Sequence, residues 1–134
     1  MAIHLRSKLG KTFQTSAGHW TVYLMVAECF GWKSKGTLPP EGFPRSEQWD
    51  GNYDSSDAQR VEDSEAKELA KILHGAAAGP HIGQALADVI RHVENSAEQS
   101  GITIHPSMRM SPEQFNNEFS PLLFLLYDGE FFIE

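Results

Sequence analysis

Apolar residues recur along the chain at spacings that predict four helices. From residue 16 they fall at steps of three and four, the stripe of a helix over 16–30, although β-branched residues in this stretch make a strand the competing interpretation. Amphipathic faces of the same kind predict helices over 63–77 and 81–99. A capping box with proline at the first helical position opens the last helix, over 112–127.

Two proline-containing pairs shape the connections between these helices. Gly79-Pro80 leaves only a tight joint between the second and third helices, which are therefore expected to form an antiparallel hairpin. Ser120-Pro121 lies inside the last helix, which is expected either to kink at Phe119 or to restart there. The common core of the helices is predicted to consist of Leu69, Leu73, Leu86, Val89, Ile90, Leu122, Leu123 and Leu126.

Short extended stretches predict a small sheet beside the helices. Strands are expected near 59–62 and 130–133, with a further small extended piece at 102–104. Ile3 and Leu5 alternate with polar residues, which fits a short strand or an irregular arm. The predicted fold is therefore α+β and mainly α, with about four helices packed on a two- or three-stranded sheet.

An irregular loop is predicted over about 32–58. Residues 32–49 contain two glycines and three prolines at spacings that neither a helix nor a central strand can accommodate. Residues 50–57 are rich in Asp, Asn, Ser and Gly, which favour turns because their polar side chains bond to nearby backbone groups. The long connection between the first and second helices is thus expected to carry turns rather than regular structure.

Chain length and composition are those of one globular domain over residues 1–134. At 40% hydrophobic content the chain can bury a core of its own. Its single cysteine, Cys29, excludes an internal disulfide, and its apolar neighbours predict a buried, inert thiol. No apolar run approaches a membrane span, and the N-terminus lacks the apolar region of a signal peptide, so we expect a cytoplasmic protein with no membrane association.

The net charge of −7 is unevenly distributed along the chain. Residues 1–40 carry five basic residues against one acid, whereas residues 41–70 carry nine acids against three bases. An acidic chain repels phosphate backbones, so direct nucleic-acid binding is not expected. A basic protein partner fits this charge better.

No catalytic, metal-binding or cofactor-binding residues are predicted. The six histidines lack metal-ligand spacing, and the chain contains no HExxH, GxSxG, GxGxxG or P-loop motif. Asp50, Asp54 and Asp57 lie close together, but with Asp50 counted as the first residue the sixth is Ser55 and the twelfth is Val61, which does not match an EF-hand calcium loop. Turn formation is the favoured role for these aspartates.

Several fragments, in order along most of the chain, resemble a layout found in small uncharacterised bacterial proteins, some of them immunity-protein-like. The resemblance implies an immunity or antitoxin role. This sequence departs from the layout at Asp57-Ala58, where a glycine-containing turn is expected, and at Asp128-Gly129-Glu130, where a double glycine is expected. The matching fragments are Gly31-Trp32, Gly36-Thr37, the W-x-G-N-Y type stretch Trp49-Asp50-Gly51-Asn52-Tyr53, Gln59 with Val61, Ala66-x-x-Leu69-Ala70, and Phe124-Leu125 through Gly129, Phe131 and Ile133.

Charge and resemblance together predict an acidic interaction protein without catalysis. It would bind and neutralise a basic toxin or effector, such as a nuclease domain, by masking its surface. The alternatives are a small enzyme or ligand-binding domain with a site between the helices and the 32–58 loop, and a regulatory subunit with no toxin involved. The predicted partner-binding residues are Trp49, Asp50, Tyr53, Asp54, Asp57 and Glu62.

Overall fold

The computed structural model describes residues 2–101 and 110–134 and has an α+β, mainly α fold. The elements follow one another as two strands, a helix, a strand, three helices and a final strand. The helices are α1 (Ala17–Cys29), α2 (Asp63–Ala78), α3 (Ile82–Gln99) and α4 (Pro112–Tyr127). The strands are β1 (Ala2–Ser7), β2 (Thr12–Ser16), β3 (Gln59–Val61) and β4 (Phe131–Ile133).

The sheet has four antiparallel strands in the order β2-β1-β4-β3. Side chains alternate across it, so that residues such as Ile3 and Leu5 face the helices while His4 and Arg6 face away. The expectation of two or three strands was wrong because β2 was missed. With Phe13 as its only large apolar residue, β2 has too weak an alternation to be recognised, and its pairing with β1 makes it a strand.

Local sequence signals account for the starts of α1 and α4. Ser16 caps α1 by accepting a hydrogen bond from the backbone N–H of His19 at 3.0 Å. Ser111 and Gln114 form the predicted capping box at the start of α4. Of the two outcomes expected at Ser120-Pro121, the helix does not restart, because α4 continues from Pro112 to Tyr127 with Pro121 inside it.

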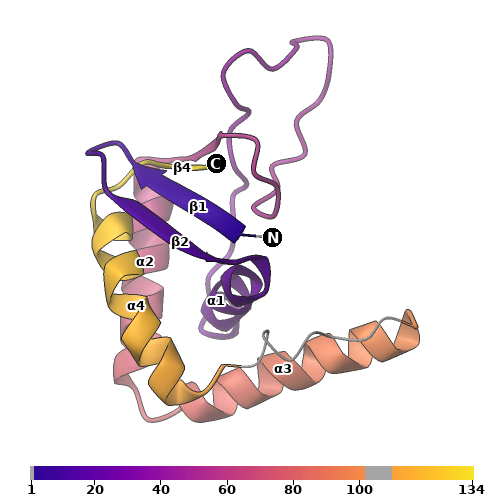
Figure 1. The fold of residues 1–134 in the computed structure, drawn as a ribbon, viewed down its shortest axis with the longest axis vertical. Coiled ribbons are helices and arrows are strands. Elements are labelled where there is room, and N and C mark those ends of the chain that lie inside the picture. Colours follow the sequence, from indigo (N-terminus) through magenta and orange to yellow (C-terminus); the bar gives the residue numbers. More distant parts are fainter. Residues whose placement is uncertain (1, 102–109) are drawn as a thin grey trace.

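The antiparallel hairpin of α2 and α3 is not formed. Figure 1 shows α2 and α4 side by side, while α3 leaves the end of α2 at a steep angle and extends away from the rest of the molecule. The buried face of α3, which includes Leu86 and Val89, packs mainly on α1. A tight joint limits the distance between two helices but does not fix their crossing angle, which the packing partner decides.

The core lies between the sheet and the helices and contains most of the predicted residues. Ile90 and Leu123 are only half-buried and pack at its margin.

Cys29 is exposed, so the prediction of a buried thiol was wrong. The residue lies in the last turn of α1, where the chain leaves the core. None of the helices in the described ranges is long and apolar enough to cross a bilayer. The extended piece expected at 102–104 lies outside the described residues.

Candidate functional site

The predicted loop joins α1 to β3 and is closed at its base by contacts between two of its own segments. The backbone N–H of Thr37 donates to the Gly51 carbonyl at 3.0 Å, and the Thr37 hydroxyl donates to the Asn52 carbonyl at 2.7 Å. Gly36 and Gly51 pass so closely that a Cβ on Gly51 would lie 3.3 Å from the Gly36 Cα. The loop therefore returns to its starting point before it enters β3, as Figure 1 shows at the top of the molecule.

Residues 50–57, which we call the acidic turn, are ordered around Gln59. The Gln59 side chain is fully buried, donates to the Ser55 carbonyl at 2.7 Å and accepts from the backbone N–H of Asp57 at 2.9 Å. The Asn52 side chain accepts from the backbone N–H groups of Asp54 and Ser55 at 3.1 and 2.9 Å. These bonds hold the turn in one conformation, as expected for Asn and Asp in turns.

The predicted acidic residues are all on the surface. Asp50, Asp54 and Asp57 are exposed on the acidic turn, and Glu62 is exposed at the N-cap of α2, beyond β3. Hydrogen bonds from Asn52 hold the pKa of the Asp50 carboxyl below its usual range, so Asp50 keeps its charge. Within the described part of the chain, none of the four carboxylates forms an ion pair.

The two aromatic residues predicted to bind a partner both make contacts within the loop. The Tyr53 side chain is only 8% exposed and packs edge-on against Trp32, with ring centroids 5.5 Å apart. A buried ring offers little surface to a partner, so Tyr53 is placed as an anchor of the loop itself. Trp49 is half-buried, donates its indole N–H to the Thr37 carbonyl at 3.1 Å and packs on Phe43.

A buried carboxylate, Glu65, escaped the sequence analysis. It lies in the first turn of α2, is 1% exposed and accepts from the backbone N–H of Lys35 at 3.1 and 3.3 Å. An acid in the first turn of a helix is usually on the surface, where it complements the helix dipole. The signal that could have identified its burial is its position four residues before Leu69, on the apolar face of the helix.

The basic residues near the N-terminus are neutralised within the fold. Lys8 pairs with Asp63 at 2.9 Å, Lys11 with Asp128 at 2.9 Å, and Arg6 with Glu134 at 2.6 Å. Seven of the nine acids of segment 41–70 remain exposed, since Asp63 takes part in these pairs and Glu65 is buried. The exposed seven are Glu41, Glu47, Asp50, Asp54, Asp57, Glu62 and Glu68.

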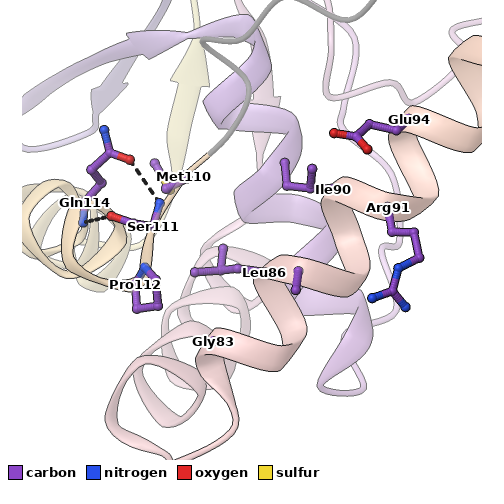
Figure 2. A pocket seen from close by; sticks show the side chains of 10 residues that line it. Gly83, Leu86, Ile90, Arg91, Glu94, Met110, Ser111, Pro112 and Gln114 are labelled. Atoms are coloured by element: carbon purple, nitrogen blue, oxygen red, sulfur yellow. Dashed lines mark hydrogen bonds between the residues drawn. The ribbon is translucent and has the colours of Figure 1, made fainter.

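Two cavities lie near elements that could form a site. One of about 370 Å³ lies between α1 and the loop and is lined by residues that include Glu28, Trp32, Asn52 and Asp54. The other, of about 600 Å³, is a groove between α3 and the start of α4. Figure 2 shows Leu86 pointing across this groove toward α4 while Arg91 points away from it. The groove contains none of the residues predicted to bind a partner.

The described residues offer no group of three or more His, Cys, Asp or Glu side chains that could hold a metal ion in residues 2–101 and 110–134.

A separate polar cluster joins α1 to α4, where Glu118 accepts from the Thr15 hydroxyl and contacts His19 Nδ1 at 3.1 Å. The buried hydroxyl of Tyr23 faces the same carboxylate without completing a hydrogen bond. The contact between His19 and Glu118 links α1 to α4.

No protein-family model, curated protein or solved structure matches this chain. The resemblance to small immunity-like bacterial proteins stays a prediction.

Proposed function

We propose that this chain is a cytoplasmic interaction protein that uses the acidic turn to bind a basic protein partner. It would mask a toxin or effector, such as a nuclease domain, in the manner of an immunity protein or antitoxin. Binding of this kind requires a surface complementary in charge and shape but no catalytic residue. The site consists of Asp50, Asp54 and Asp57, extended by the exposed part of Trp49 and by Glu62.

The observation that carries the proposal is an ordered turn whose three aspartates form no ion pair among the described residues. Gln59 and Asn52 order the backbone of the acidic turn without using the Asp54 or Asp57 carboxylates. A surface ordered before binding loses less conformational entropy when the partner docks. Uncompensated negative charge also speeds the approach of a basic partner.

The experiment compares capture of proteins from the native host by three forms of this chain. In the loop variant, Asp50, Asp54 and Asp57 are all changed to Asn, which keeps the shape of each side chain. In the matched control variant, Glu68, Glu98 and Glu113 are changed to Gln, which removes the same charge from exposed positions on the helices. The wild type and the control are expected to retain one basic protein at low salt, and the loop variant is expected to lose it.

Equal capture by all three forms would refute the acidic turn as the binding surface. Equal loss in both variants would show that net charge matters and its position does not. Retention of an acidic or neutral protein would contradict the proposed charge complementarity. Raising the salt concentration should weaken capture by the wild type, because exposed charges are screened.

The cavity beside the loop supports a second candidate function, the binding of a small molecule. It lies between α1 and the loop, where the sequence predicted the alternative site, and its ionisable lining groups include Glu28 and Asp54. This lining favours a cationic ligand. A screen of small amines and guanidines by shifts in the resonances of Trp32 and Asn52 tests it, and no shift at millimolar concentration would exclude this ligand class.

A further inference from the structure

The base of the loop is gathered around one side chain of α2. Groups from two separate parts of the loop approach the Glu65 carboxylate, namely the backbone N–H of Lys35, the indole of Trp32 and the hydroxyl of Tyr53. Trp32 and Tyr53 also contact each other edge-on. Glu65 is thus the common neighbour of both ends of the loop.

Two of the donors beside Glu65 have no well-placed acceptor among the described residues. The Trp32 Nε1 and the Tyr53 hydroxyl are buried and complete no hydrogen bond of good geometry within the described structure. Buried donors without a partner cost free energy, so a carboxylate beside them relieves a cost that an apolar side chain would leave in place. The buried Glu65 carboxylate in turn requires these donors, because burying a carboxylate without hydrogen-bond partners costs free energy.

The acidic turn follows directly from this cluster. Tyr53 lies inside the acidic turn, between Asn52 and Asp54. The Asn52 side chain orders the turn, and Asp54 is one of its exposed aspartates. The Tyr53 carbonyl also accepts the indole N–H of Trp20 at 2.8 Å, which ties the same residue to α1. The position of Tyr53 therefore decides where the exposed aspartates lie relative to the helices.

We infer that Glu65 is the positioning residue of the acidic turn: its buried carboxylate holds Lys35, Trp32 and Tyr53 together and so fixes the surface that carries Asp50, Asp54 and Asp57. The inference rests on the proposed function only in taking that surface to be the one that binds a partner. The positioning itself is a property of the free protein.

The ionisation of Glu65 provides a signal that reports on this role. Burial raises the pKa of the Glu65 carboxyl, while the Lys35 N–H and its positive charge act in the opposite direction and Glu68 raises the pKa further. The Tyr53 hydroxyl also interacts with the Glu65 carboxyl, and the charge of Glu62 acts on Tyr53 as well. Glu65 should therefore take up a proton at a higher pH than the usual glutamate value of about 4.3.

The test follows the indole N–H resonances of the three tryptophans between pH 4 and 8 in the wild type and Glu65→Gln. Trp32 should show the largest shift, with its midpoint above about 4.3, and this shift should vanish in Glu65→Gln. Trp20 and Trp49 serve as references because each donates to a backbone carbonyl. Glu68→Gln is the matched control, since Glu68 is exposed on the same helix, and it should retain the Trp32 titration.

Hydrogen exchange then measures the positioning directly. In Glu65→Ala, the amides of Lys35 and of the acidic turn should exchange roughly three- to tenfold faster, as loss of one buried hydrogen bond requires, while amides of β1 and α4 stay protected. If Glu65→Ala does not fold, the titration in Glu65→Gln decides alone, because glutamine keeps the side-chain volume. A Trp32 shift that persists in Glu65→Gln, or unchanged loop exchange in folded Glu65→Ala, would overturn the inference. Both readouts need no partner, so failure of partner binding would leave the inference standing.

Discussion

Ala58 adopts a backbone conformation that its side chain disfavours. Its φ of +65° lies in the left-handed region, and it is the one non-glycine residue with positive φ among the described residues. Its N–H donates to the Ile133 carbonyl at 2.8 Å, which holds it where the loop enters β3. The resemblance to small bacterial proteins led us to expect glycine in this turn, and the geometry gives that expectation a physical reason.

Ala58→Gly is therefore expected to stabilise the protein. The left-handed conformation destabilises the folded state of an alanine by roughly 1–2 kcal/mol, which glycine would remove. The greater conformational freedom of glycine in the unfolded chain offsets roughly 0.5–1 kcal/mol of this gain. The net gain in the free energy of unfolding should be about 0.5–1 kcal/mol, measured by urea denaturation. The control is Ala87→Gly, the same change at an exposed position inside α3, which should destabilise by roughly 0.5–1 kcal/mol. Equal effects of the two substitutions would show that backbone strain at Ala58 is unimportant.

Cys29 is expected to react with a maleimide in the native protein because it is exposed. Its pKa is raised, first by partial burial and then by the charges of Asp88 and Glu28, so less thiolate is present at neutral pH than in a free cysteine. Labelling should be slow at pH 7 and accelerate as the pH rises, and Asp88→Asn should speed it at pH 7. A thiol that reacts only after unfolding would contradict the exposed position.

At the level of single residues, the sequence pattern of the loop did not show which side chains are buried. Tyr53 lies among polar and charged neighbours, a pattern that fits a surface contact as well as a buried anchor. Glu65 and Gln59 are buried because each shares a face with apolar neighbours, Leu69 in one case and Val61 in the other. Those periodicities were available in the sequence, but burial of a polar side chain depends on donors from distant segments.

Among the elements, the contact between the β1–β2 hairpin and the start of α2 should depend on pH. Hydrogen bonds from Lys8 and then Lys67 lower the pKa of Asp63 to about 2. A lowered pKa in the folded state means that the pair stabilises the protein above the unfolded value of about 3.9 and loses this effect as the pH falls toward 2. The difference in stability between the wild type and Asp63→Asn should therefore shrink between pH 5 and 2, measured by denaturant unfolding.

Screening provides the control for this ion pair. The Lys8 and Asp63 side chains are both partly exposed, so the difference at pH 6 should also shrink as salt is added. A difference that is constant with pH and salt would show that Asp63 acts through its close contact with Gly129 rather than through its charge.

Neighbouring leucines of α4 should differ in their effect on stability. Leu122 is fully buried, whereas Leu123 is half-buried at the margin of the core. Leu122→Ala should reduce the free energy of unfolding by roughly 2–5 kcal/mol, and Leu123→Ala should reduce it clearly less because fewer contacts are lost. Equal losses, measured by thermal or urea unfolding, would show that the face of α4 has been misassigned.

The elements themselves were predictable where the sequence carries local signals. All four helices and the strands β3 and β4 occur where periodicity, caps and breakers placed them. Strand β2 was missed because its own alternation is weak, although its partner β1 directly precedes it in the chain. The direction of α3 was missed because it depends on packing against α1, which is distant in sequence. Periodicity identifies the buried face of a helix, but the element that covers this face is decided by the fold.

Over the whole molecule, the fold pairs the basic residues near the N-terminus with acids and leaves the acids of the loop without ion pairs among the described residues. Basic residues from the N-terminal hairpin are paired with acids from α2 and the C-terminal region, which were distant in sequence. The acids of the loop have no such compensation in the described structure, and the acidic turn presents three of them on an ordered backbone. The excess of acid was predictable from composition, whereas the pairing of the N-terminal bases with acids distant in sequence was not.

The measurement that tests the central claim most directly is the association rate constant with the captured partner as a function of salt concentration. The wild type and the Glu68, Glu98 and Glu113 control variant should associate fast at low salt and slow steeply as salt rises. The variant with asparagine at positions 50, 54 and 57 should associate at least about tenfold more slowly at low salt and converge with the wild type at high salt, because exposed charges act mainly on the rate of encounter. Identical rate constants and salt dependences for the wild type and the loop variant would contradict the claim that the acidic turn binds a basic partner.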